Sequence, residues 1–231
     1  MAKVITAKEV AAMVKEGDKI LFGTFLCAGA AQDLIDALVE AGTKNLQIVA
    51  ISTDWDGKGI GKLFNSGQVK RAQISWNGGN KAAQSQYASK ELDIEFNPQG
   101  SLMERIRAGG AGLGGFLTPT GIGTVIEEQR ETLEVDGKKF ILEKPIRGDF
   151  AFVKAAKADK VGNLTYSKTS RNSNPVMATA ADVVIAEVDE IVETGDIDPE
   201  DIITPGLFVD YIVKSKKRTH EERIEMIKRP Q

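Results

Sequence analysis

The order of apolar segments and amphipathic helices in the first hundred residues most limits what this chain can fold into. Residues 19–22 form an apolar segment typical of a strand, and a loop leads from it into an amphipathic helix over residues 31–41. Residues 46–51 are apolar enough for a buried parallel strand. This strand–loop–helix–strand order is a βαβ unit. It predicts an α/β fold with an open, mostly parallel sheet and flanking helices.

Further segments extend this sheet and add an antiparallel region. Thr6 and Glu9 form a capping box, which predicts a helix over residues 7–15. Asp136-Gly137 lies between two alternating segments and is a strong signal for an added β-hairpin. We expect residues 1–231 to form one domain. The other expected elements are strands at residues 70–76, 92–96, 151–155 and 182–188, and helices at residues 82–90 and 175–181.

Composition and charge exclude several classes of protein. The formal net charge is -3 at pH 7, whereas a nucleic-acid-binding protein would usually be basic. No stretch approaches the ~18 uninterrupted apolar residues of a membrane span, and the N-terminus lacks the layout of a signal peptide. The single cysteine, Cys27, and the single histidine, His220, exclude a disulfide framework and His/Cys metal clusters. We therefore expect a cytoplasmic protein without a metal, a nucleic-acid partner or a membrane partner.

A glycine-rich run after the last of the N-terminal strands holds the first candidate site residue. Ser101 and Glu104 form an S-x-x-E capping box, so we expect a helix that begins at Leu102 and ends at Gly109. Gln99 then lies in a turn at the carboxyl end of a strand, where ligands of open α/β sheets gather. Its amide can donate a hydrogen bond to an oxygen on which negative charge develops. A bond to the neighbouring backbone is the alternative.

The loop at residues 23–29 is the second candidate site. It joins a strand to a helix, so its backbone N–H groups and the helix dipole can hold an anion such as a phosphate. The loop matches neither G-x-G-x-x-G nor a Walker A motif, so an ordinary βα turn is the alternative. Cys27 lacks a histidine partner, and we expect it to serve packing.

Several charged residues are further candidates. Asp54 and Asp56 resemble a carboxylate pair, and a glycine-rich surface turn explains them equally well. Glu187, Glu190 and Glu193, at steps of three, are expected to face solvent. Arg105 and Arg107 either meet an acidic substrate or a partner carboxylate or lie on a surface helix, which we expect. The tail, residues 214–231, carries seven Lys/Arg between Lys214 and Arg229 at helix-like spacing. Such a tail is either a solvated face or a contact with a partner subunit.

Several of these motifs together resemble one enzyme family. The runs at residues 98–112 and 116–124 are similar to the alpha subunit of family I coenzyme A transferases, which act on acetate, acetoacetate, butyrate and other short acids. The resemblance covers nearly the whole chain. It continues through residues 162–166, 171–175, 187–195 and 204–206.

The resemblance implies a ping-pong exchange of CoA between two carboxylic acids. In the family a glutamate attacks the acyl-CoA, and an acyl anhydride and a glutamyl-CoA thioester follow. That glutamate belongs to the beta subunit, within a Ser-Glu-Asn-Gly tetrapeptide that this chain lacks. The implied protein is therefore inactive alone and forms an α₂β₂ complex with its beta subunit. Acyl-CoA and short-chain acids are its substrates, and no cofactor is permanently bound.

The family's site residues transfer to two places in this chain. Gln99 matches the glutamine of the family's Pro-Gln-Gly motif and is implied as an active-site donor to the thioester or anhydride oxygen. The implied CoA-binding segment is Gly23, Thr24, Phe25, Leu26, Cys27, Ala28 and Gly29. Thr24 and Ala31 replace a glycine and a proline of the family pattern, and Ile51-Ser52 replaces an Asn pair of some relatives. A Cβ at Thr24 is expected to narrow the space for a ligand.

Two alternatives use a related α/β scaffold. A sugar-phosphate isomerase would need a base in the cleft, and we find no Asp/Glu and Lys constellation that supplies one. A sugar-phosphate-binding sensor usually carries a fused helix-turn-helix, which is not evident in this sequence.

Overall fold

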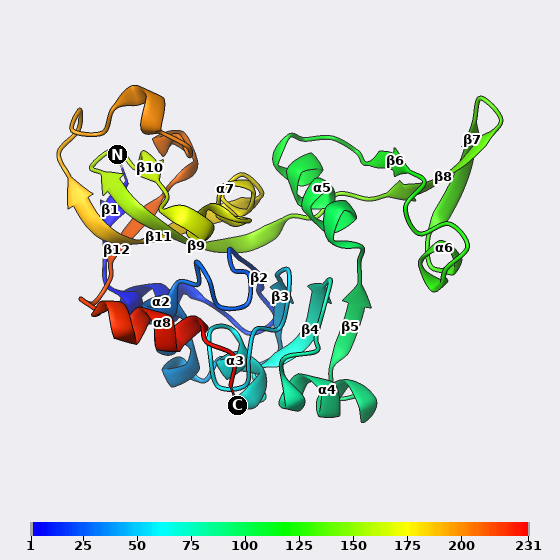
Figure 1. Cartoon of the computed structure of the whole chain (residues 1–231), viewed down its shortest axis with the longest axis horizontal. Helices are drawn as coiled ribbons and strands as arrows, with labels where there is room; N and C mark the ends of the chain where they lie inside the picture. The colour runs from blue at the N-terminus through cyan, green and yellow to red at the C-terminus, as the bar shows by residue number, and fades with distance from the viewer. Residues whose placement is uncertain (1, 231) are drawn as a thin grey trace.

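A parallel β-sheet forms the centre of the molecule (Figure 1). The structure is a computed structural model, and it describes residues 2–230. In spatial order the strands are β1 (Lys3–Val4), β12 (Tyr211–Lys214), β11 (Ala181–Val192), β9 (Gly148–Asp159), β2 (Lys19–Phe22), β3 (Leu46–Val49), β4 (Val69–Ile74) and β5 (Asp93–Phe96). Each neighbouring pair in this order is parallel, and β10 (Leu164–Thr165) pairs antiparallel with β9. The predicted open, mostly parallel sheet is confirmed.

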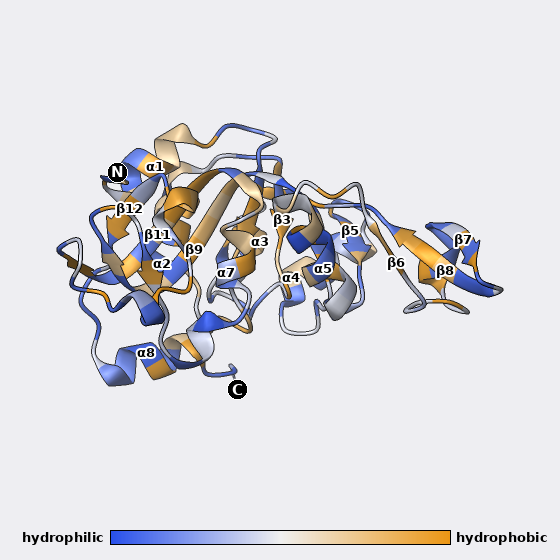
Figure 2. Cartoon of the chain, turned by 90° about the horizontal axis from the view of Figure 1, so that it is seen from above, coloured by the Kyte–Doolittle hydropathy of each residue, from blue (hydrophilic) through white to orange (hydrophobic). Residues whose placement is uncertain are grey.

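Helices cover both faces of the sheet. Successive side chains of a strand point to opposite faces, and because the central strands are apolar throughout, both faces must be covered. In β2, Ile20 and Phe22 pack into the core on one face, whereas Leu21 packs into the core on the other. Figure 2 shows the apolar residues gathered in the central strands between the helices. The first face carries α1 (Ala7–Met13), α2 (Gln32–Ala41), α3 (Gly61–Asn65) and α4 (Lys81–Ala88), and the second carries α5 (Gln99–Gly110) and α7 (Asn174–Met177).

Local sequence signals mark several helix ends. Thr6 and Glu9 form the predicted capping box, with Glu9 N donating to Thr6 Oγ1 over 3.2 Å and Thr6 N donating to the Glu9 carboxylate over 2.7 Å. Gly42 ends α2 in the left-handed conformation, as predicted. The helix expected at residues 175–181 is shorter, because the chain already enters β11 at Ala181.

The start of α5 differs from the prediction. The helix begins at Gln99 rather than Leu102, because Pro98 is its N-cap and accepts the first helical hydrogen bond from Leu102 N at 2.9 Å. Ser101 therefore lies inside the helix and caps nothing. The helix also continues past Gly109 to Gly110.

Four further helices are short. They are η1 (Lys168–Arg171), η2 (Pro199–Asp201), η3 (Gly206–Phe208) and α8 (His220–Ile227). Among residues 2–230, no helix combines the length and the apolar composition that crossing a bilayer requires.

Residues 112–144 form an arm that extends away from the main sheet (Figures 1 and 2). The predicted hairpin is confirmed within it, with Asp136 and Gly137 both at positive φ (52° and 72°) as a two-residue turn requires. All five residues of the edge strand β7 are exposed. The arm contains β6 (Phe116–Thr118), α6 (Val125–Glu128), β7 (Glu131–Val135) and β8 (Lys138–Glu143), with antiparallel strand order β6-β8-β7.

The glycines at the end of α5 allow close packing, which yields a testable prediction. A Cβ on Gly109 would lie 2.1 Å from the Ile146 carbonyl oxygen, whereas a Cβ on Gly100 of the same helix meets nothing within 4 Å. We expect Gly109→Ala to lower the free energy of unfolding by about 1–3 kcal/mol through overpacking. Gly100→Ala is the matched control and is expected to be neutral or stabilising. Urea denaturation of both variants decides the matter, and equal effects would contradict the packing role.

Candidate functional site

The loops that follow β2, β3, β4 and β5 lie at one edge of the main sheet, because these strands run parallel. Together they line a cavity of about 400 Å³. Gln99 therefore meets Phe25 and Leu26 of the predicted loop at residues 23–29. Cys27, Ala28 and Gly29 of that loop line a separate cavity of about 370 Å³ instead. The lining residues are Phe25 and Leu26 after β2, Ile51 and Ser52 after β3, Ser75 and Trp76 after β4, and Asn97, Pro98 and Gln99 after β5.

Gln99 lies at the N-terminus of α5. It is the first residue of the helix, three residues beyond the end of β5, and its side chain is exposed. Within residues 2–230, no hydrogen bond joins the Gln99 amide to another residue, so the alternative of a bond to neighbouring backbone is not observed. The amide is thus available to a molecule in the cavity.

Trp76 and Ser75 form part of the cavity wall, although neither was predicted as a site residue. The Trp76 side chain is 43% exposed and lies edge-to-face against Trp55, with ring centroids 5.9 Å apart. Both residues end the strand predicted at residues 70–76. Because that strand runs parallel to the one before Gln99, its end could have been predicted to lie near Gln99 at the same edge of the sheet.

A tight turn forms the cavity side of the loop at residues 23–29. Phe25 and Ala28 exchange two backbone hydrogen bonds of 3.0 Å. Between them Leu26 and Cys27 adopt positive φ values of 49° and 69°, a conformation that costs a non-glycine residue about 1 kcal/mol or more. The turn points Phe25 and Leu26 into the cavity. Cys27 is buried, as expected for a packing residue.

Asp54 lies beneath this turn and corrects the expectation of a surface carboxylate. It is fully buried, and it accepts hydrogen bonds from the Cys27 backbone N–H (2.8 Å) and the Thr24 hydroxyl (3.1 Å). Burial raises the pKa of Asp54 to about 6 against the opposing effect of these hydrogen bonds. Asp56 is half-buried and accepts a hydrogen bond from Lys81 N (3.0 Å) at the start of α4.

Glu187 corrects a second expectation, because it is completely buried rather than solvent-facing. Its carboxylate accepts hydrogen bonds from the N–H groups of Asp33 (2.8 Å) and Leu34 (3.2 Å) in the first turn of α2. The expected anion at this helix N-terminus is therefore a side chain of the protein itself. Glu190 and Glu193 are exposed, as expected.

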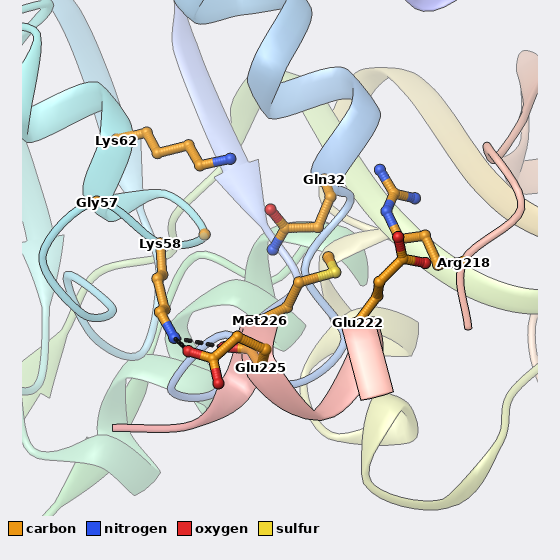
Figure 3. A pocket seen from close by; sticks show the side chains of 9 residues that line it. Gln32, Gly57, Lys58, Lys62, Arg218, Glu222, Glu225 and Met226 are labelled. Atoms are coloured by element: carbon orange, nitrogen blue, oxygen red, sulfur yellow. Dashed lines mark hydrogen bonds and ion pairs between the residues drawn. The ribbon is translucent and has the colours of Figure 1, made fainter. Parts of the chain in front are cut away.

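A second cavity, of about 410 Å³, lies between α2, α3 and the C-terminal helix α8 (Figure 3). Three cations line it, and each already has a carboxylate partner. The pairs are Lys58 with Glu225 at 2.9 Å, Lys62 with Asp36 at 2.6 Å, and Arg218 with Asp33. This pairing makes the cavity a weak candidate for an anionic ligand.

The basic tail contacts the body of its own chain. The Trp55 indole N–H donates to the Ile227 carbonyl oxygen (3.3 Å), and Arg223 pairs with Asp189 at 3.0 Å. None of the residues of α8 is buried. Gln231, at the end of the predicted tail, lies outside the described residues.

Ion pairs join α5, the helix that begins at Gln99, to β5 and to the arm. Arg105 is only 6% exposed, contrary to the expectation of a surface helix, and its guanidinium pairs with Glu95 at 2.6 Å. Arg130 of the arm reaches the same Glu95 oxygen at 2.6 Å. Burial disfavours the charged Glu95 carboxylate, but Arg105, Gln73 and Arg130 together outweigh it and lower the pKa of Glu95 to about 2. Arg107 is exposed, as expected.

The sequence of this chain matches those of known proteins over most of its length. Residues 4–215 match the family model described as Coenzyme A transferase. The alpha subunit of the acetate CoA-transferase of Escherichia coli (strain K12) is 43% identical over 215 residues, which cover 93% of this chain and 98% of that protein. The acetoacetyl-CoA:acetate/butyrate CoA transferase alpha subunit of Clostridium acetobutylicum is 41% identical over 213 residues, covering 92% and 98%.

A solved structure shares the fold at lower sequence identity. The acyl-CoA transferase YdiF of E. coli O157:H7, in a thioester complex with CoA, superposes with a TM-score of 0.87 at 23% identity. The match covers 94% of this chain and 48% of the YdiF chain, so this chain spans about half of that protein.

The Glu95 network makes a prediction about stability and pH. Because folding lowers the pKa of Glu95, its ionised form stabilises the fold above pH 4.5, and this stabilisation is lost as the pH falls toward 2. We expect Glu95→Gln to lower the free energy of unfolding at pH 7 by about 2 kcal/mol, since it removes one of the two carboxylates that Arg105 and Arg130 share and leaves only that of Glu143. Glu104→Gln, which breaks the exposed pair with Arg107, is the control and should cost under about 1 kcal/mol. Chemical denaturation at pH 7 and pH 3 tests this, and a Glu95→Gln effect that is equal at both pH values would contradict it.

Proposed function

The chain belongs to the coenzyme A transferase family, and we propose that it is the alpha subunit of a two-subunit enzyme that moves CoA between short-chain carboxylic acids. The observation that carries this proposal is the cavity that Gln99 lines together with Phe25 and Leu26 of the loop at residues 23–29. Sugar-phosphate isomerase and sugar-phosphate sensor functions find no support in these relatives.

The proposed reaction is a ping-pong exchange with a nucleophilic glutamate on the beta subunit. Its carboxylate attacks the thioester carbonyl carbon of acyl-CoA, and the CoA thiolate leaves, which gives a mixed anhydride. The thiolate then attacks the glutamyl carbonyl carbon, releasing the first acid and forming glutamyl-CoA. The incoming acid reverses these steps and leaves as the new acyl-CoA.

In this scheme the present chain stabilises charge and positions CoA. The free amide of Gln99 donates a hydrogen bond to the oxygen that becomes negative in each tetrahedral intermediate. The turn at Phe25 and Leu26, with Trp76, offers apolar contact to the aliphatic pantetheine arm. No Ser-Glu-Asn-Gly tetrapeptide occurs in the chain, so the nucleophile comes from a partner in an α₂β₂ assembly.

The cavity wall bears on the class of acid. Its nine lining residues include no lysine and no arginine. The cavity itself therefore provides no positive charge for a second carboxylate, as a dicarboxylic substrate would require, and this favours monocarboxylic acids such as acetate and acetoacetate unless the partner subunit supplies the charge.

Assembly provides the first test of this function. We expect the purified chain alone to show no transfer of CoA from acetoacetyl-CoA to acetate, because the nucleophile is missing. Mixing it with a beta subunit that carries Ser-Glu-Asn-Gly should restore transfer, measured by the loss of acetoacetyl-CoA absorbance. Robust turnover by the single chain would refute the proposal.

Gln99 provides the second test, on the reconstituted complex. We expect Gln99→Ala to lower kcat by roughly 10²–10³, the usual effect of removing an oxyanion donor. Gln84→Ala, at an exposed glutamine of α4 outside the cavity, is the control and should leave kcat unchanged. A loss of less than threefold for Gln99→Ala would show that another group stabilises the oxyanion.

A further inference from the structure

The Asp54 carboxylate joins two loops that form the cavity. From the loop after β2 it accepts hydrogen bonds from Thr24 Oγ1 (3.1 Å) and Cys27 N (2.8 Å). From the segment after β3 it accepts bonds from Ser52 Oγ (3.3 Å) and Ile60 N (3.1 Å). One side chain therefore sets the position of the two segments relative to each other.

Both segments supply walls of the cavity. Leu26 lies between the residues that Asp54 holds in the first loop, and Ser52 is itself a wall residue. Positive φ values at Leu26 and Cys27 persist only where surrounding contacts fix them. The two backbone bonds between Phe25 and Ala28 close the turn, and the bond from Cys27 N to Asp54 ties it to the segment after β3.

Thr24 contributes to this arrangement instead of obstructing the ligand. Its side chain is completely buried, it points to Asp54, and it does not line the cavity. Its Cβ therefore does not narrow this cavity. A glycine at this position would take one donor away from Asp54.

Burying the Asp54 carboxylate is energetically unfavourable. No lysine or arginine is among its four donors, and burial of an unpaired carboxylate disfavours its charged form. The nearby titratable groups are the buried Cys27 thiol and Lys58 of the same turn. A buried charge that opposes folding is typical of a residue kept for function.

We propose that Asp54, with Thr24, is a positioning residue that holds the turn at residues 25–28 in its binding conformation for acyl-CoA. This inference rests on the proposed function for its kinetic effect. Its structural part concerns the chain alone and can be tested separately.

Hydrogen exchange of the isolated chain tests the structural part. We expect Asp54→Asn and Thr24→Val to speed amide exchange at residues 25–28 at least tenfold. Thr24→Ser keeps the hydroxyl group and should exchange at the wild-type rate. Thr53→Val is the matched control, because Thr53 is equally buried and its hydroxyl has no hydrogen-bond partner among residues 2–230. Unchanged exchange in Thr24→Val would overturn the proposal, and this variant decides the matter if Asp54→Asn fails to fold.

Kinetics of the reconstituted complex test the functional part. We expect Asp54→Asn to raise KM for acyl-CoA about tenfold, while KM for the acceptor acid stays within twofold. Wild-type KM for acyl-CoA should also rise below about pH 6, where the carboxyl group becomes protonated, and this rise should be absent in Asp54→Asn. Equal KM values for the two proteins would overturn the inference, whereas a wild-type complex without transfer would refute the proposed function instead.

Discussion

Parallel hydrogen bonding between neighbouring strands is the constraint on which the rest of this structure depends. Because β2, β3, β4 and β5 run in the same direction, each loop after them must emerge at the same sheet edge. Gln99 and the turn at Phe25 and Leu26 come from opposite ends of this four-strand group, yet they line one cavity. No local motif needs to bring them together, because the direction of the strands already does so.

The fold could be predicted in some detail because its signals are local. The capping box at Thr6 and Glu9, the stop at Gly42 and the turn at Asp136-Gly137 each involve residues within a few positions of one another. The start of α5 was misplaced because two local signals competed. Ser101 has the sequence of a cap, but Pro98 fixes the backbone first.

The charged residues could not be placed from local patterns. Asp54 bonds to Thr24, thirty positions away, and Glu187 bonds to Asp33 across 154 positions. A carboxylate in a glycine-rich turn or an acidic residue repeated at steps of three is usually exposed, so the local pattern gave the wrong answer. In both cases buried backbone donors, which a sequence does not display, draw the carboxylate inward.

The arm has a consequence for how the chain behaves at high concentration. Leu133 and Val135 are 40% and 42% exposed on β7, whose outer backbone groups have no strand beside them among residues 2–230. An uncovered strand edge with apolar side chains is a template for pairing between molecules. Overproduction of this polypeptide by itself should therefore favour oligomers and precipitates, and charged replacements on that edge would improve its yield.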